Sequence, residues 1–251
     1  MAADLVARAK DESSLRPMPG YATIGRFMKG QGLVRHKRKT RPDAEPHEQR
    51  ETRSYESAYV NGLWHTDFHQ CSRKVLTAAG QWRPAFAFGI LDDCSRLCCH
   101  LQWYLAETAQ WLAHGTSQAI QKRGLPRCYL SDNGSAMLAA EIGEGLERLG
   151  IAHKTTLPYS PEQNGKQESF WGRVEGRLMP MLEGEPNLTL ALLNRATMAW
   201  VEQEYQRTPH SETGEPPLTR FMRGPSVSRP SPSSDALRRA FRMEVSRTQR
   251  R

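Results

Sequence analysis

Apolar and polar positions first follow a pattern along the chain that predicts strands. Residues 63–68 have a period of two, and apolar side chains recur through 75–91 and 97–104. The last two segments are joined by the short stretch D-D-C-S-R, and two strands with so short a connection pair antiparallel. The pattern therefore predicts three antiparallel strands.

The spacing of apolar residues then becomes helical. Residues 108–122 and 141–149 predict helices, and each is followed by a short apolar segment, 127–131 or 151–157, that predicts a strand. A longer helix is predicted over 188–206. Antiparallel strands followed by strands that alternate with helices indicate an α/β architecture of packed layers.

The two ends of the chain differ in composition from this middle part. Near the N-terminus, Ile24, Phe27 and Met28 have the i, i+3, i+4 spacing of one helix face. Charged and polar residues then form a linker, and the C-terminal end is rich in Pro, Ser and Arg. We therefore divide the chain into a helical segment 1–39, a linker 40–57, a main domain 58–222 and an extended, basic, Pro/Ser-rich tail 223–251.

The charge of the chain favours a polyanionic partner. Its 251 residues carry a net charge of +8, and the isoelectric point is about 9.4. Residues 219–251 alone contain nine arginines against two acidic residues, and a second basic run, R-H-K-R-K-T-R, occupies 35–41. Such residues attract nucleic acid by neutralising phosphates and releasing counterions. A soluble basic protein without that partner can have the same composition, so charge alone does not decide.

Hydrophobic content and cysteines limit the class of protein. Apolar residues make up 38% of the chain, which suffices for a packed core. No stretch approaches the roughly 18 apolar residues of a membrane span, and the N-terminus has no apolar signal region, so we expect a soluble, cytoplasmic protein. The five cysteines have no paired C-x-x-C arrangement, which indicates buried, reduced thiols.

Three carboxylates are the candidates for chemistry. Asp67 lies at the end of the first predicted strand, Asp132 follows a later strand in S-D-N-G, and Glu168 lies in a helix that opens at S-P-E-Q or restarts after N-G. Taken singly, each is more often a turn, cap or surface residue. Carboxylates that meet repel one another unless cations neutralise them, and hard oxygen ligands suit Mg²⁺, with Mn²⁺ as a substitute. Together they predict a divalent metal site.

Short motifs around these acids occur in an order that is typical of one family. Any one of the strings is a weak signal, but their combination is specific. Between Asp132 and Glu168 there are 35 residues. Over roughly 58–222 the chain resembles D,D(35)E insertion-sequence transposases, which have a retroviral-type integrase catalytic core. The motifs are L-D-D-C-S-R, L-S-D-N-G-S, L-G-I-A-H-K-T-T-L-P-Y-S-P, Q-N-G-K-Q-E-S-F-W and Y-Q-R-T-P-H-S.

The resemblance implies a fold and an activity. The fold would be RNase H-like, a mixed five-stranded sheet flanked by helices, with a helical N-terminal remnant and an extended basic C-terminal tail. The activity would be metal-dependent cleavage of DNA 3′ ends and strand transfer, with Asp67, Asp132 and Glu168 as catalytic residues and Mg²⁺ ligands. The partners would be element ends and target DNA, bound by a nucleoid-associated homo-oligomer.

The resemblance also marks candidate contacts to DNA. In the family the lysine two residues before the catalytic glutamate lies near DNA, and Lys166 has that position here. The segment A-T-I-G-R-F-M-K-G-Q-G-L-V-R resembles the last helix of a helix-turn-helix that precedes many such cores. For each contact the alternative is a solvated surface group. The other candidates for contacts to the phosphate backbone are Lys154, Asn133, Asn164, Arg35, Lys37, Arg38 and Lys39.

Other residues compete for a metal role. Asp92 and Asp93 lie in the predicted hairpin turn, where Asp side chains accept backbone hydrogen bonds, and the turn role is favoured. His65 and His69 share the strand face of Asp67, which leaves a supporting role at the metal site open beside simple packing or exposure. The spacing of the His and Cys residues matches no paired zinc pattern.

Two other functions stay open. A DNA nuclease of the same fold would cut without strand transfer. A truncated, non-catalytic DNA-binding derivative would regulate a full-length transposase, because related transposases often continue into a small β-rich DNA-binding domain that this sequence does not match. Metal-dependent cleavage separates an enzyme from a pure DNA-binding protein.

Overall fold

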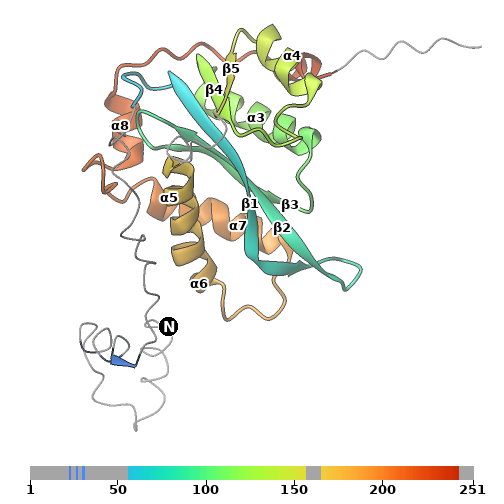
Figure 1. Cartoon of the computed structure of the whole chain (residues 1–251), viewed down its shortest axis with the longest axis vertical. Coiled ribbons are helices and arrows are strands. Elements are labelled where there is room, and N and C mark those ends of the chain that lie inside the picture. Colours follow the sequence, from blue (N-terminus) through green and yellow to red (C-terminus); the bar gives the residue numbers. More distant parts are fainter. Residues whose placement is uncertain (1–22, 24–26, 28–29, 32–55, 157–164, 243–251) are drawn as a thin grey trace, which may run out of the picture. The chain divides into compact units, whose positions relative to one another are not determined.

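The structure is a computed structural model that describes residues 56–156 and 165–242, together with residues 23, 27, 30 and 31 (Figure 1). The chain divides into two compact units, Met1–Glu51 and Thr52–Arg251. All elements discussed below belong to the second unit. Of the predicted N-terminal helix, Thr23, Phe27 and Gly30 are described and are helical, and its other residues lie outside the described ones. The basic run at 35–41 and nearly all of the linker also lie outside the described residues.

Five strands form one mixed sheet in the order β3-β2-β1-β4-β5. Strand β1 pairs antiparallel with β2 and parallel with β4, while β2 pairs antiparallel with β3 and β4 pairs parallel with β5. The predicted α/β architecture with three antiparallel strands is confirmed. The strands are β1 Leu63–Leu76, β2 Trp82–Asp92, β3 Cys98–Tyr104, β4 Cys128–Ser131 and β5 Ala152–Thr155.

The first hairpin differs from the prediction. Strand β1 continues to Leu76, and the chain turns between Thr77 and Gln81, whose backbones share a hydrogen bond of 2.9 Å. Gly80 in that turn has a φ of 73°, a left-handed conformation that glycine adopts without a steric penalty. The predicted strand 75–91 therefore contains the end of β1, a turn and β2. The turn signal, Gly80 between Thr77 and Gln81, was present in the sequence but was not used to end the strand.

Helices cover both faces of the sheet (Figure 1). Helices α3, α4 and α9 belong to the apolar core on one face, and α5, α6 and α7 belong to the core on the other. The sheet is therefore the middle of three layers. The helices are α3 Ala109–Arg123, α4 Ala140–Arg148, α5 Gly165–Arg173, α6 Met179–Met181, α7 Leu190–Trp200, α8 Pro217–Arg223 and α9 Ser234–Ala240, with π-helical turns η3 Val174–Leu178 and η4 Val201–Tyr205.

Strand β2 shows how the sequence builds these two cores. Phe88 and Ile90 are fully buried in the core with α3 and α4, whereas Ala87 and Leu91 are buried in the core with α5 and α7. Successive side chains of a strand point to opposite faces, so a strand covered on both sides is apolar at every position. This explains why the central segment lacks the alternation of a strand with one solvated face.

The described part of the predicted extended tail 223–251 pairs with the core. Residues 224–233 are extended, but Ser226 forms a parallel bridge with Val60, and Arg229 forms an antiparallel bridge with Leu125. The chain then enters α9, which lies against α3 and α4. The pairing of backbone groups with the core gives this Pro- and Ser-rich segment a fixed course that its composition did not predict.

Candidate active site

Asp67 and Asp132 lie at corresponding positions of two neighbouring parallel strands. His65 of β1 pairs with Leu130 of β4, and two further residues along each chain bring Asp67 level with Asp132. Asp132 directly follows the last residue of β4. The end of a parallel strand is a common place for functional side chains. The structure thus brings together two of the three predicted catalytic residues.

The carboxylate of Asp67 is in an unfavourable place for a negative charge. Burial raises the pKa of Asp67 to about 6, and the nearby charge of Asp132 adds to this rise. The indole Nε1 of Trp171 opposes it by donating a hydrogen bond of 2.9 Å to Oδ2 of Asp67. A cation between the two carboxylates would relieve both the burial cost and the repulsion, so the donor set fits a divalent metal.

Trp171 is held in place by residues of β1 and η3. Its ring stacks on His69, with centroids 4.9 Å apart and an interplanar angle of 13°. His69 Nε2 in turn lies 2.9 Å from Oε1 of Glu175. Gly89 of β2 leaves room for the indole, because a Cβ there would lie 2.6 Å from Cη2 of Trp171. His69 thus supports Asp67 through Trp171, and no sequence pattern marked that indirect route.

Asp132 is oriented by the tight turn that follows β4. The backbone N–H of Gly134 donates to Oδ1 of Asp132 at 3.0 Å. Asn133, a predicted DNA contact, instead donates from Nδ2 to the carbonyl oxygen of Thr156 at 3.0 Å. Glu107 is also a neighbour of the site. Burial raises its pKa, and the nearby charge of Asp132 raises it further. Nothing in the sequence pattern marks Glu107 as a neighbour of the catalytic acids.

Glu168 lies in the first turn of α5 and is exposed to solvent. It precedes Trp171 by three residues, so the two side chains lie on one side of the helix, the side that bonds Asp67. Within 56–156 and 165–242, however, no group of three His, Cys, Asp or Glu side chains is arranged to hold a metal ion. In the structure the two aspartates are neighbours, and Glu168 lies on the adjacent helix α5.

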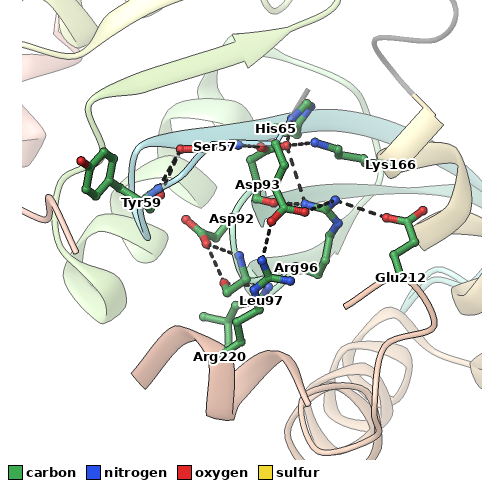
Figure 2. A network of polar contacts seen from close by, with 12 residues as sticks. Ser57, Tyr59, His65, Asp92, Asp93, Arg96, Leu97, Lys166, Glu212 and Arg220 are labelled. Carbon is green, nitrogen blue, oxygen red and sulfur yellow. Dashed lines mark hydrogen bonds and ion pairs between the residues drawn. The ribbon is translucent and has the colours of Figure 1, made fainter. Parts of the chain in front are cut away.

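A buried polar network ties the start of α5 to the β2–β3 turn (Figure 2). Lys166 forms an ion pair with Oδ1 of Asp93, and the Lys166 side chain is only 15% exposed. His65 Nε2 lies 2.7 Å from the same oxygen. The next helix residue, Gln167, donates from Nε2 to the carbonyl oxygen of His65 at 2.8 Å. Lys166 thus contacts protein here, and its predicted contact to DNA stays a prediction.

Asp92 and Asp93 have the turn role that was favoured for them. Asp92 accepts hydrogen bonds from the backbone N–H groups of Asn61 at 2.7 Å and Ser95 at 2.8 Å. Burial raises the pKa of Asp93, but the hydrogen bonds and charges of His65 and Lys166 outweigh it and hold that pKa well below its usual range. The oxygens of both carboxylates are thus engaged by protein groups.

The remaining predicted residues fall into three groups. Lys154 is exposed on β5, opposite Leu130 of β4, where a contact to a ligand is sterically open. The five cysteines are free, and burial raises the pKa of Cys71 to about 11 and that of Cys98 to about 12, as expected for inert thiols. Outside the described residues lie Asn164, Arg35, Lys37, Arg38 and Lys39.

The layered fold, with one aspartate on β1 and one just after β4, has the architecture of an RNase H-like core. Residues 58–161 match the family model described as integrase core domain. These residues therefore resemble an integrase core domain. The fold and the family resemblance predicted from the sequence are confirmed.

Curated relatives share part of this region. The chain is 26% identical over 165 residues to the insertion element IS476 uncharacterized 39.2 kDa protein of Xanthomonas euvesicatoria, covering 66% of this chain and 45% of that protein. It is 31% identical over 88 residues to uncharacterized protein K02A2.6 of Caenorhabditis elegans, covering 35% of this chain and 6% of that protein. The chain thus spans less than half the length of these relatives.

Solved structures share the fold. The HTLV-2 integrase catalytic core domain in complex with magnesium matches with a TM-score of 0.52 and 21% identity, covering 66% of this chain and 99% of that one. A chain of the simian T-cell lymphotropic virus intasome in complex with the PP2A regulatory subunit B56 gamma matches with a TM-score of 0.57 and 19% identity, covering 72% of this chain and 60% of that one. At these identities the likeness shows the fold alone.

A search for membrane spans gives a negative result for the part of the chain that the structure describes. None of its helices combines the length and the apolar character needed to cross a bilayer.

Proposed function

We propose that the chain is a transposase or integrase that cuts DNA at 3′ ends and joins them to target DNA. One observation carries the proposal: Asp67 on β1 and Asp132 just after the parallel strand β4 are close enough to interact, with the pKa of Asp67 raised to about 6 by burial and by the charge of Asp132. A fold keeps two such groups together at a cost in stability, which is typical of sites that bind a cation or a substrate.

Each of the two aspartates has one oxygen fixed by a protein N–H group. Trp171 holds Oδ2 of Asp67, and Gly134 holds Oδ1 of Asp132. We assign the other oxygen of each carboxylate to the metal, with Glu168 on the neighbouring helix as the third ligand. Bound Mg²⁺, or Mn²⁺ in its place, would activate a water or a 3′-hydroxyl and stabilise the leaving oxygen of the phosphodiester.

The protein groups around the metal ligands have supporting roles. The stack of Trp171 on His69 fixes the orientation of Asp67, and the Asp93 network fixes the first turn of α5, which carries Glu168. Ligands that are held in this way can receive the scissile phosphate with little rearrangement. We include the integrase fold as support, because the HTLV-2 catalytic core was solved in complex with magnesium.

The proposed partners are the DNA ends of a mobile element and the target DNA, bound in the bacterial cytoplasm. Joining two ends requires at least two subunits on DNA, so we propose a homo-oligomer. Structures of the similar HTLV-2 core are described as dimeric and trimeric. Lys154, Asn133 and Lys166 stay candidates for contacts to the phosphate backbone.

The test is cleavage and strand transfer on a labelled duplex that carries the ends of the element flanking the gene. Wild type is compared with Asp132→Asn and Glu168→Gln, in Mg²⁺ and in Mn²⁺, and DNA binding is measured in parallel. Glu183→Gln is the matched control, because Glu183 is an exposed acid outside the site. We expect wild type and the control to cut and join, and the two site variants to bind DNA while cutting falls to background.

Other outcomes select the alternatives. Cutting without joining favours a nuclease of the same fold. Binding without cutting by soluble wild-type protein favours a regulatory derivative of a full-length transposase. Cutting that survives Glu168→Gln removes Glu168 from the catalytic set.

A further inference from the structure

Three exposed arginines surround an open pocket on the helical layer that does not contain α5. The pocket has a volume of about 300 Å³ and is lined by Asp235, Arg238, Arg239 and Arg242. The first three belong to α9, and Arg242 follows it by two residues. The volume accommodates a phosphate group with part of its sugar. The pocket belongs to the layer of α3 and α4, so it is separate from the side of the sheet where Trp171 bonds Asp67.

The segment that carries these arginines is fixed to the core. Leu237 is 1% exposed, and Ala240 is 7% exposed, in the layer of α3 and α4. Phe241 packs on Gly145 of α4, where a Cβ would lie 2.3 Å from Cδ1 of the phenyl ring. Arg148 of α4 donates from Nη1 to the carbonyl oxygens of Ala240 and Arg242, each at 2.9 Å. The three arginines therefore belong to a segment that is packed against the core.

The charges of the three arginines converge on one carboxylate. A hydrogen bond from Arg238, then its charge, and more weakly the charges of Arg239 and Arg242, lower the pKa of Asp235. Three cations around a single anion leave the pocket with a net positive charge. Guanidinium groups bind phosphate oxygens through paired N–H groups, and arginine is the usual residue for that purpose.

We propose that Arg238, Arg239 and Arg242 form a binding site for the phosphate backbone of DNA. The choice of DNA over other polyanions rests on the proposed function. Because the site lies in the layer opposite α5, it would hold a stretch of duplex that is distinct from the phosphodiester at Asp67 and Asp132. Contacts of this kind contribute affinity without sequence preference.

The experiment measures binding of a fluorescent duplex of random sequence by anisotropy over a series of salt concentrations. The test variant is R238Q/R239Q/R242Q. The matched control is R83Q/R177Q/R195Q, which removes the same charge at exposed positions of β2, η3 and α7. All six side chains are exposed, so both variants should unfold at the wild-type temperature.

For the test variant we expect weaker binding and a slope of log K against log salt that is smaller by about 2–3, since each phosphate contact contributes roughly 0.9. The control should keep the wild-type slope. Asp235→Asn should bind DNA more tightly than wild type, because it removes the anion that competes with phosphate. A test variant with the wild-type slope, or a control with the same loss, overturns the proposal.

Failure of this site and failure of the catalytic proposal give different results. If wild type cuts no DNA but the slope falls in the test variant alone, the arginine site stands and the proposed function fails. If wild type cuts and joins DNA while the slope is unchanged in the test variant, the proposed function stands and the arginine site fails. Wild-type protein that does not bind the duplex at all contradicts the arginine site.

Discussion

Two pairs of aspartates in the sheet and its turns have different surroundings. Asp92 and Asp93 follow β2 into its turn and are 0% and 1% exposed, and their oxygens accept hydrogen bonds from backbone N–H groups and nearby side chains. Asp67 lies on β1 and accepts hydrogen bonds from Trp171 and from the backbone of Phe68, and Asp132 lies just after β4 and accepts one from Gly134. Within the first pair, Asp93 is neutralised by the cations of Lys166 and Arg96.

The difference separates carboxylates that stabilise a structure from those available for chemistry. At Asp93 the cations outweigh the effect of burial, so its pKa is lowered. At Asp67 burial and the charge of Asp132 outweigh the bond from Trp171, so its pKa is raised to about 6. Burial also raises the pKa of Asp92, but its oxygens accept three hydrogen bonds from Asn61 and Ser95. Asp67 bears the cost of burial and the repulsion from Asp132, and a metal ion would relieve both. The first pair thus accounts for the rigidity of the turn, and the second for the proposed reaction.

The largest expected effect is the loss of Asp93. In Asp93→Asn the cations of Lys166 and Arg96 lose the buried charge that compensates them, and breaking a buried pair costs about 3–5 kcal/mol. We expect that loss in the free energy of unfolding measured with urea at pH 7. Asp235→Asn, at an exposed position, serves as the control and should change little. A loss below 1 kcal/mol for Asp93→Asn would remove the distinction between the two pairs.

Asp67→Asn should change the free energy of unfolding in the opposite direction, because it should make the protein more stable at pH 7. The folded-state pKa of Asp67 is above its unfolded value of 3.8, so the folded protein binds the proton more tightly, and stability is lost as the pH rises from about 4 to about 6. Replacing Asp67 removes that loss. The variant should therefore be more stable than wild type at pH 7, by up to about 3 kcal/mol, and nearly equal at pH 4. Urea unfolding of both proteins at the two pH values checks this, and a variant that is less stable at pH 7 contradicts it.

Trp171→Phe has a smaller expected effect on the same carboxylate. The substitution removes the Nε1 donor to Asp67 and also leaves a small cavity. The cavity costs the same at every pH, whereas a hydrogen bond to the ionised acid is stronger than one to the neutral acid. The stability lost between pH 4 and pH 7 should therefore be about 1 kcal/mol larger than in wild type. An unchanged difference between the two pH values would mean that the indole does not stabilise the carboxylate.

Much of the fold could be predicted from local patterns. The D-D-C-S-R turn, the helical spacing of 108–122 and the short strands around 127–131 all act over a few residues, and the structure contains each of them. The first hairpin was placed wrongly because the polar residues and Gly80 between Leu76 and Ala85 were not taken as a turn. The docking of 224–233 could not be predicted, because a Pro- and Ser-rich composition does not encode which backbone it will pair with.

The candidate site shows the same difference between local patterns and long-range contacts. Motif order sufficed to nominate Asp67, Asp132 and Glu168, but their surroundings depend on contacts between distant parts of the chain. The bond from Trp171 to Asp67 spans 104 positions and the pair of Lys166 with Asp93 spans 73. Local spacing carries no sign of such contacts. The role of Lys166 therefore changed from a predicted DNA contact to a protein contact, while its behaviour on DNA stays a prediction.

The most direct test of the account is to count bound Mn²⁺ by electron paramagnetic resonance at pH 7.5, since bound ions lose the sharp signal of the free ion. We predict binding by wild type, loss of binding in Asp67→Asn and in Asp132→Asn, and weaker binding in Glu168→Gln, with the control Glu183→Gln unchanged. Equal binding by wild type and both aspartate variants would contradict the claim that Asp67 and Asp132 hold the metal.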